Sequence, residues 1–353
     1  MRIAILSPVW FPVPPERYGG IESVVSLLTD GLVSRGADVT LFASGDSITS
    51  APLVHVFDRA PSERIGETFW ELNHALACLT QLEEFDLVHD HTGLLGLTLF
   101  GLADTPVVHT VHGPLEKVPA EMYLSACSVA HDIGLVSLTH AQRRPLPDLP
   151  WLANIENGID TARYPFEPDP GDGLLFLGRM SPEKGAHRAI EVARRTGRPL
   201  RIAAKCREPG ELAYFDAEIR PHLGADIEYV GEVGHDEKCR LLTEAHALVV
   251  PIDWEEPFGL VMIEAMACGT PVVALRRGSV PEVIDHGRTG LVVDDLEGMA
   301  TAVEEVGHLD PLELRREVET RFSAERMVDD HLEAYERFLD PIAVRAGTLA
   351  TVG

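Results

Sequence analysis

The chain has 353 residues, of which 45% are hydrophobic and 24% charged, and its formal net charge is −26. This length exceeds the usual size of one hydrophobic core and predicts two domains of about 150 residues each. The negative charge argues against binding of nucleic acid, or of an anionic membrane, through the overall field. Peripheral membrane contact through a local patch stays open, and so does the oligomeric state.

The N-terminal stretch, the lengths of the apolar stretches and the cysteines indicate the cellular compartment. The N-terminal stretch MRIAILSPVW is typical of a first strand and not of a signal peptide, and no stretch approaches the length of a transmembrane helix. The cysteines are odd in number, lie far apart and form no C-x-x-C pair: Cys78, Cys127, Cys206, Cys239 and Cys268. This pattern favours reduced thiols in a cytoplasmic protein over a disulfide framework or a zinc site.

Short apolar runs alternate with amphipathic helical patterns along the whole chain. Strands are expected in the first half at 2–9, 38–44, 86–91, 106–113 and 132–139, and in the second half at 174–180, 200–205, 227–233, 247–252, 271–275 and 290–293. This alternation predicts an α/β protein whose parallel sheets are covered by helices on both faces.

The segment 155–173, IENGIDTARYPFEPDPGDG, separates the two halves. Its prolines and glycines cannot continue a helix, so it is typical of a linker. We expect these parts: an N-terminal domain (1–157), a linker (158–172), a C-terminal domain (173–322), a helix (323–340) that is a candidate for packing back on the N-terminal domain, and a tail (341–353). Two such α/β halves make a cleft where ligands commonly bind.

Glu264 stands in an otherwise apolar run, VMIEAMAC. If the run is helical, Leu260 and Cys268 share the face of Glu264. Burying an ionised carboxylate without a partner costs several kcal/mol or more, so either another residue or a ligand must hydrogen-bond to it.

Three stretches could bind an anion. In LGRMSPEKG (177–185), Arg179 leaves a strand and Lys184 enters the predicted helix start at Ser181-Pro182, so both cations could reach a diphosphate. The same spacing also fits two surface charges that flank a turn. In PFGLVM, Pro257 at a helix start would leave free the amides of Phe258, Gly259 and Leu260.

The third stretch, YGGIE, places Gly19 and Gly20 in a loop between the first strand and a helix. No G-x-G-x-x-G occurs, which disfavours a nicotinamide dehydrogenase.

The histidines raise the question of a metal. His112 ends a strand, whereas His109 lies inside it as a core residue; His89 and His91, in HDHT, share one face of a strand end. Two histidines alone rarely make a metal site, and no further ligands follow at a recognisable spacing.

Together these stretches resemble the retaining glycosyltransferases of GT-B architecture, specifically the bacterial family 4 group. The resemblance rests on E-x(7)-E from Glu256 to Glu264, on GR…EKG upstream, on NGID at 157–160 and on YGG after the first strand. It covers essentially the whole chain. One departure is RRGSVPE, which offers only Gly278 where the family often has paired glycines.

The resemblance implies a role for each residue. Glu264 would hold the ribose hydroxyls of the nucleotide, Glu256 the hydroxyls of the transferred hexose, and His112 would lie beside that hexose. The diphosphate contacts would come from Arg179, Lys184, the amides of Phe258, Gly259 and Leu260, and Gly19 and Gly20, and the nucleobase would lie near 229–233. Lys205, at a strand end, is a further departure from the family pattern and a candidate third cation for the phosphate site. No metal or other cofactor is expected beyond the donor, a UDP-hexose by preference or a GDP-hexose.

The expected reaction moves a hexose to a small hydroxylated acceptor with retention, by same-face attack in a closed cleft. Three alternatives stay open: a GT-B epimerase or phosphorylase, a nucleotide-sugar sensor without transfer activity, and, more remotely, a metal-dependent hydrolase built on HDHT. The sugar and the acceptor are not specified by the sequence.

Overall fold

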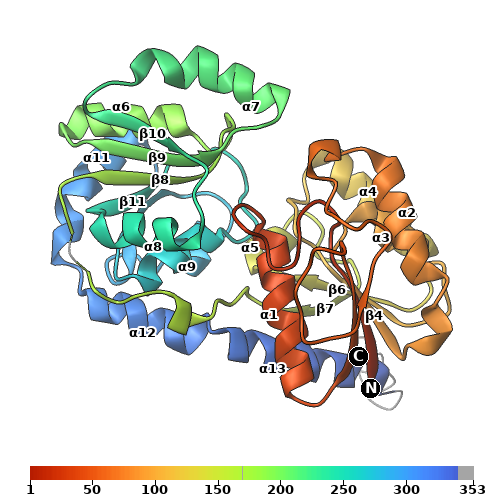
Figure 1. Cartoon of the computed structure of the whole chain (residues 1–353). Helices are drawn as coiled ribbons and strands as arrows, with labels where there is room; N and C mark the ends of the chain where they lie inside the picture. The colour runs from red at the N-terminus through yellow and green to blue at the C-terminus, as the bar shows by residue number, and fades with distance from the viewer. Residues whose placement is uncertain (169, 341–353) are drawn as a thin grey trace. The chain divides into compact units, whose positions relative to one another are not determined.

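The computed structural model describes residues 1–168 and 170–340. The chain forms two compact units, each around its own parallel sheet (Figure 1). Unit 1 comprises Met1–Pro15, Gly19–Gly158 and the described residues from Ala324 on, and unit 2 comprises Glu16–Tyr18 and the described residues of Ile159–Ser323. Among the described residues, no helix is both long and apolar enough to span a bilayer.

Unit 1 contains a seven-stranded parallel sheet of order β3-β2-β1-β4-β5-β6-β7. The strands are β1 (Arg2–Leu6), β2 (Asp38–Phe42), β3 (Leu53–Val54), β4 (Leu87–Asp90), β5 (Val107–Thr110), β6 (Ile133–Ser137) and β7 (Trp151–Asn154). The central strands are buried along their whole length, because helices cover both faces of the sheet.

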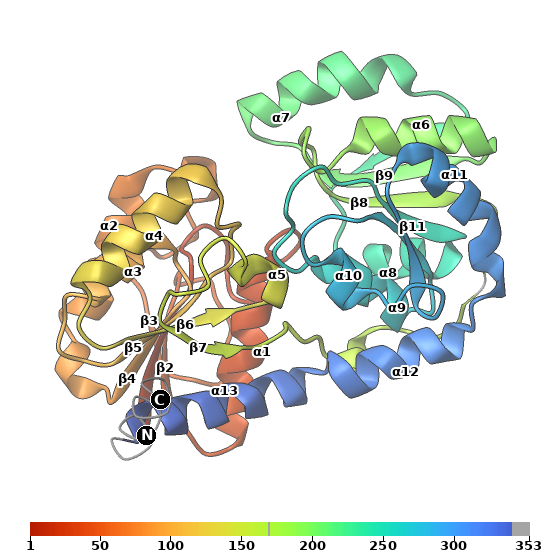
Figure 2. The ribbon, with the colours of Figure 1, turned by 180° about the vertical axis from the view of Figure 1, so that it is seen from behind.

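The helices of unit 1 form two layers. They are α1 (Gly20–Ser34), α2 (Thr68–Leu79), α3 (Leu94–Phe100), α4 (Lys117–Val129), the single turn α5 (His140–Arg143) and α13 (Ala324–Leu339). Seen from behind, α2, α3 and α4 lie together on one face of the sheet, while α1 and α13 lie on the other (Figure 2).

Helix α13 belongs to unit 1 although it is last in sequence. Its buried residues Met327, Val328, His331 and Tyr335 form one stripe at helical spacing. A Cβ added at Gly31 of α1 would lie 2.5 Å from Val328 Cγ2, so a glycine is needed where the two helices touch.

Unit 2 contains a six-stranded parallel sheet of order β10-β9-β8-β11-β12-β13. The strands are β8 (Leu174–Arg179), β9 (Leu200–Lys205), β10 (Ile227–Gly231), β11 (Ala247–Val250), β12 (Val272–Leu275) and β13 (Gly290–Val293). All six strands that the sequence predicts for this half are present, whereas β3 and β7 of unit 1 are not predicted.

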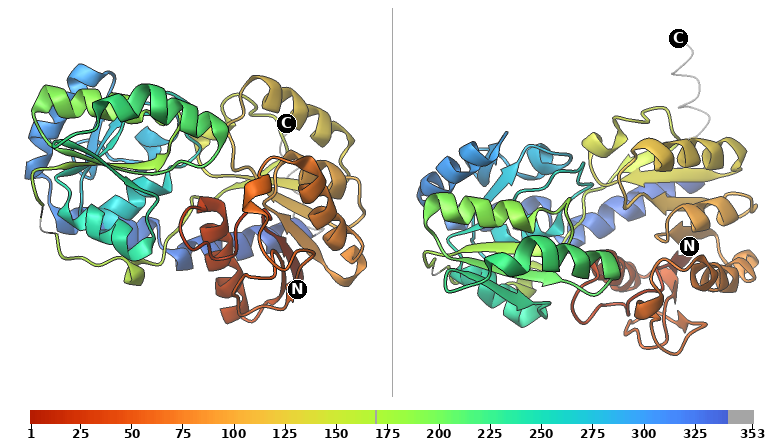
Figure 3. Two further views of the ribbon diagram at one scale, coloured as in Figure 1. Left: turned by 45° about the horizontal axis from the view of Figure 1, so that its top comes forward. Right: turned by 90° about the horizontal axis from the view of Figure 1, so that it is seen from above.

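The helices of unit 2 are α6 (Ala186–Thr196), α7 (Pro209–Tyr214), α8 (His235–Glu244), α9 (Leu260–Ala267), α10 (Val280–Val283), α11 (Leu296–Glu305) and α12 (Pro311–Arg321). Helices α6 and α11 pack together on one face of the sheet, α8 and α9 cover the other, and α12 lies along α9 (Figures 1 and 3).

Both predicted helix starts in this half are wrong by several residues. Helix α6 begins at Ala186 and not at Ser181, because Gly185 takes a left-handed conformation (φ 83°) and residues 181–185 form a turn. Helix α9 begins at Leu260 and not at Pro257, again after a left-handed glycine, Gly259 (φ 82°). Glycine adopts positive φ at little steric cost, so it sets both starts.

Candidate functional site

The strand order places a ligand-binding edge in each unit. In unit 2, β8 and β11 are neighbours, but the chain leaves β8 toward β9 and leaves β11 toward β12. Sheets of this kind bind ligands outside the carboxyl ends of the strands at such a switch point. The loop after β8 carries Lys184, and the loop after β11 carries Glu256 and Phe258.

Lys184 and Glu256 meet across these two loops. Lys184 Nζ donates to Glu256 Oε2 at 2.5 Å, and the indole Nε1 of Trp254 donates to the same oxygen at 2.9 Å. The ammonium also lies 4.5 Å from the centroid of the Trp254 ring. The side chain of Lys184 is only 21% exposed and that of Glu256 only 11%. Lys184 is therefore not an isolated surface charge beside a turn, which is the other interpretation of its place in the sequence.

Arg188 connects the loop after β8 to the loop after β11. Its Nε donates to Pro251 O at 2.6 Å, and its NH2 donates to the carbonyl oxygens of Pro182 and Glu183, both at 3.1 Å. One guanidinium therefore satisfies carbonyl groups of both loops. Arg188 is not among the site residues that the sequence predicts, because it is the third residue of α6, a helix that begins later than predicted.

Arg179 and Lys205 stand side by side at the ends of β8 and β9, where they are partners in the strand register. Glu211 connects them: its Oε1 accepts a hydrogen bond from Lys205 Nζ at 2.8 Å and lies 4.0 Å from Arg179 Nε. Arg179 also pairs with Glu183 at 2.7 Å, and Lys205, only 3% exposed, pairs with Glu208 as well. Arg179 Nε is buried and has no hydrogen-bond partner among the described residues.

Glu264 lies on α9 and is 8% exposed. Tyr164 OH donates to its Oε1 at 2.9 Å, and Lys238 Nζ donates to the same oxygen at 2.5 Å. Burial, and then the carboxylate of Glu264, raise the pKa of Tyr164 well above its usual range, so this phenol keeps its hydrogen. The buried acid thus has protein partners, and both bind one of its two oxygens.

The start of α9 offers backbone donors. Within the described part of the chain, the amides of Phe258, Gly259 and Leu260 have no hydrogen-bond acceptor. Gly278 brings the loop after β12 against this region, since a Cβ there would lie 2.4 Å from the backbone nitrogen and oxygen of Glu256. Gly278 alone therefore allows the loop after β12 to approach the backbone of Glu256 closely.

In unit 1, β1 and β4 form the corresponding switch point. Gly19 caps α1 with φ 148°, and a Cβ there would lie 2.7 Å from Pro15 Cβ and 3.0 Å from Glu22 Oε2. Glu22 is itself 4% exposed, and burial raises its pKa to about 8. Glu22 is not among the site residues that the sequence predicts, although as a carboxylate on the buried face of α1 it is comparable to Glu264.

His112 follows β5, and its Nε2 lies 2.9 Å from Nδ1 of His91, which follows β4. His109 is a buried core residue, as predicted: its Nδ1 binds Asp90 Oδ2 at 2.7 Å and its Nε2 binds Tyr123 OH at 3.2 Å. Within the described residues, no group of three or more His, Cys, Asp or Glu side chains is arranged to hold a metal ion.

The predicted site residues therefore fall into two sets. Unit 2 gathers Arg179, Lys184, Lys205, Glu256, Phe258, Gly259, Leu260 and Glu264 on loops and helix starts after its strands, and unit 1 holds Gly19, Gly20 and His112 at the equivalent edge. Residues 229–233, expected near a nucleobase, include the end of β10.

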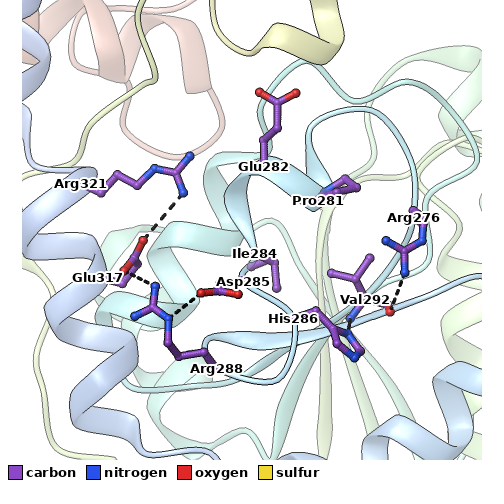
Figure 4. A pocket seen from close by; sticks show the side chains of 10 residues that line it. All are labelled: Arg276, Pro281, Glu282, Ile284, Asp285, His286, Arg288, Val292, Glu317 and Arg321. Atoms are coloured by element: carbon purple, nitrogen blue, oxygen red, sulfur yellow. Dashed lines mark hydrogen bonds and ion pairs between the residues drawn. The ribbon is translucent and has the colours of Figure 1, made fainter.

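Two hollows of unit 2 lie apart from this set. One, of about 260 Å³, is lined by Arg276, Arg288 and Arg321 together with Glu282, Asp285 and Glu317, and ion pairs join Arg288 and Arg321 to Glu317 (Figure 4). The other, of about 580 Å³, lies where β8 and β9 begin, at the opposite end of the strands from Lys184. None of the predicted donor-binding residues lines either hollow.

Comparison with known proteins identifies the architecture. Residues 165–321 match the family described as glycosyl transferases group 1, and residues 18–163 match glycosyltransferase family 4. The glycogen synthase of Mycobacterium tuberculosis is 30% identical over 361 residues, which cover 87% of this chain and 86% of that protein.

Two solved structures are similar over nearly their whole length. AviGT4, a glycosyltransferase involved in avilamycin A biosynthesis, is 27% identical with a TM-score of 0.72, over 96% of this chain and 98% of its own. HepE of Anabaena, in complex with UDP and glucose, is 19% identical with a TM-score of 0.75, over 95% and 99%. The predicted GT-B fold of two doubly wound parallel-sheet units is confirmed. The chain belongs to family 4 of the GT-B glycosyltransferases.

Proposed function

We propose that this glycosyltransferase moves a hexose, with retention and without a metal ion, from a nucleotide-diphosphate sugar to a small hydroxylated acceptor. UDP is the preferred nucleotide and GDP the alternative. The observation that carries the proposal is the meeting of Lys184 and Glu256 at the switch point of unit 2, with Arg179 at the end of β8, the strand that precedes Lys184. A cation for the diphosphate thus stands next to a carboxylate for the sugar.

The cations have the chemistry to stabilise a leaving diphosphate. Cleavage of the donor passes through an oxocarbenium-like state while negative charge builds on the diphosphate. Fixed positive groups in a partly buried site stabilise such charge without reorganising at the moment of reaction. Lys184 is held by Glu256 and Trp254, and Arg179 by Glu183, so both cations are positioned by protein contacts.

Glu264 is suited to bind a ribose. Tyr164 and Lys238 fix the carboxylate through Oε1, and Oε2 has no hydrogen-bond partner among the described residues. An ionised carboxylate oxygen accepts hydrogen bonds strongly, so Oε2 can receive the hydrogens of a vicinal diol. The amides at the start of α9, with Gly19 and Gly20, complete the proposed diphosphate contacts.

Glu256 and His112 would contact the hexose. We assign Glu256 to its hydroxyls and not to nucleophilic attack, because the hydrogen bonds from Lys184 and Trp254 hold the carboxylate and reduce its nucleophilicity. The leaving phosphate then takes the hydrogen of the acceptor hydroxyl as the acceptor attacks on the same face. We place the reaction in the cytoplasm, consistent with the five unpaired cysteines.

The test begins with a thermal-shift panel of UDP, GDP and ADP sugars, because a ligand of the folded state raises the melting temperature by mass action. The sugar that stabilises best is then incubated with candidate acceptors, with and without EDTA. We expect nucleotide release that requires an acceptor and survives EDTA, and an α-linked product from an α-linked donor. Binding without release under any condition would favour a sensor, and release without an acceptor would favour an epimerase, a phosphorylase or a hydrolase.

A further inference from the structure

His91 and His112 form a hydrogen bond between two imidazole rings. His91 Nδ1 and His112 Nε2 are 2.9 Å apart. His91 is 2% exposed, and the centroid of its ring lies 4.0 Å from that of His89. Nothing in the proposed reaction uses His91, so its contact with a proposed site residue needs its own explanation.

Both rings are neutral near pH 7. Burial lowers the pKa of His112 to about 3 and lowers the pKa of His91 well below its ordinary value, with His89 adding to the effect on His91. A neutral imidazole carries one hydrogen, so one of its nitrogens donates and the other accepts. In this contact, therefore, one ring must donate and the other must accept.

The other ring nitrogen of His91, Nε2, indicates which of the two rings donates the hydrogen bond. His91 Nε2 is buried and has no hydrogen-bond partner among the described residues. If His91 accepted at Nδ1, its hydrogen would sit on Nε2 as an unpaired buried N–H group, and such groups are rarer in native proteins than under-satisfied acceptors. His91 therefore donates from Nδ1, and His112 accepts at Nε2.

We propose that His91 is a positioning residue that fixes His112 in the tautomer with its hydrogen on Nδ1. His112 then presents an N–H donor to its ligand and cannot act there as a base. This inference rests on the proposed function, in which His112 lies beside the transferred hexose. A hydroxyl oxygen of the hexose would accept the hydrogen bond from His112, and its own hydrogen would have to go to another acceptor.

The tautomer can be read without any substrate. We would label the protein with ¹⁵N-histidine and record two-bond ¹H–¹⁵N correlations of the rings at pH 7.5, identifying the signals of His112 from their loss in His112→Gln. The expected result is a protonated Nδ1 and an unprotonated Nε2 in the wild-type protein. A His112 protonated at Nε2 would overturn the proposal.

Substitutions at His91 test its role. In His91→Phe the ring shape is kept and the donor is lost, so we expect His112 to shift to the Nε2-protonated form or to a mixture of both. In His91→Asn an amide N–H stands near the former Nδ1 and should restore the Nδ1-protonated form. His331→Phe is the matched control, because His331 is also buried, with Nδ1 bonded to Met327 O and its ring next to His89, and should leave the tautomer of His112 unchanged. The same tautomer in wild type and His91→Phe would contradict the proposal.

Kinetics give a second measurement. We expect His91→Phe to lower kcat/KM for transfer about tenfold, the scale of one lost hydrogen bond, and His91→Asn to recover most of that loss. If no nucleotide sugar supports transfer by the wild-type protein, the proposed function fails while the tautomer still decides this inference. If transfer occurs but His112 carries its hydrogen on Nε2, only this inference fails.

Discussion

The two units carry their candidate site residues at equivalent sheet edges, yet they build them from different chemistry. In unit 2 the cations Arg179, Lys184 and Lys205 are each paired with a carboxylate. In unit 1 three groups at the edge are neutral: His91 and His112 are uncharged, and Glu22 keeps its hydrogen up to a pH of about 8. The charged edge of unit 2 is suited to bind an anion. The neutral groups of unit 1 are suited to bind hydroxyl groups, and the backbone there can approach a ligand closely.

The difference affects how each edge responds to substitution. Removing one partner of a buried ion pair leaves the other charge without compensation, which is costly. Removing a neutral hydrogen bond costs less but can change which atom carries a hydrogen. Substitutions at the charged edge should therefore have larger effects than substitutions at the neutral one.

Lys184→Ala should have the largest effect on activity. Truncating one member of a desolvated charge contact typically costs about 2–5 kcal/mol, so kcat/KM for transfer should fall by about thirtyfold or more. The control is Arg198→Ala, which removes an ion pair with the exposed Glu304 elsewhere in unit 2 and should leave kcat/KM unchanged. A loss of less than a few-fold in Lys184→Ala would mean that the charge does not meet the donor.

Glu264→Gln should weaken donor binding. A hydrogen bond to a charged group contributes about 1.5–3 kcal/mol, so the Kd of the nucleotide should rise roughly tenfold to a hundredfold. The amide keeps the shape of the side chain and can still accept a hydrogen bond from Tyr164, so the fold should persist. Titration calorimetry measures the Kd, and an unchanged affinity would remove Glu264 from the ribose site.

Glu22 should make the free energy of unfolding depend on pH. Burial raises its pKa from 4.5 to about 8, so between these values the folded protein holds a hydrogen ion that the unfolded chain has lost. Stability from this group is therefore full below pH 4.5 and falls by about 1.4 kcal/mol per pH unit until pH 8. In Glu22→Gln this decline should disappear.

Urea unfolding at pH 6.5 and pH 8 tests this effect. The buried histidines His74 and His331, whose pKa values burial lowers to about 4, act in the opposite direction, but only below their unfolded pKa of 6.5. Cys239, whose pKa is lowered from 9.0 to about 5 by its hydrogen bond with Cys268, also acts in the opposite direction across the range from 6.5 to 8. The contribution of Glu22 is therefore the difference in slope between wild type and Glu22→Gln, in which the effect of Cys239 cancels. Equal slopes for wild type and Glu22→Gln in that range would show that Glu22 is ionised in the folded protein.

Gly31→Ala should have a smaller effect, confined to stability. The added Cβ would meet Val328 at 2.5 Å where α1 and α13 touch, and overpacking of this kind costs about 1–3 kcal/mol. Adding Val328→Ala removes the clash, so the double variant should lose less stability than the sum of the two single variants. Strict additivity in chemical denaturation would argue against the contact between α1 and α13.

Local sequence patterns predicted much of the fold. Buried strands such as β11 and β12 are short apolar runs that are not expected in solvent-exposed segments. The edge strands β3 and β7 escaped prediction, because β3 has only two residues and β7 is only partly buried. The starts of α6 and α9 depend on left-handed glycines, and glycine in a sequence does not reveal the sign of φ.

The candidate site was predictable in its residues and not in its contacts. Arg179, Lys184 and Glu256 follow strand ends in the sequence, which is enough to place them at one sheet edge. Glu183 is a local partner of Arg179, but Lys184 meets Glu256 from 72 residues away, and Tyr164 lies 100 residues from Glu264 in the chain. Only the folded structure brings such partners together, so no local pattern could identify them.

Recognition of a diphosphate by the edge of unit 2 can be measured by titration calorimetry with UDP and uridine. We expect UDP to bind at least tenfold more tightly than uridine to the wild-type protein, and this difference to disappear when Arg179 and Lys184 are both replaced by methionine. Equal affinities of the wild-type protein for UDP and uridine, or an unchanged preference for UDP in the double variant, would show that these cations do not bind a diphosphate.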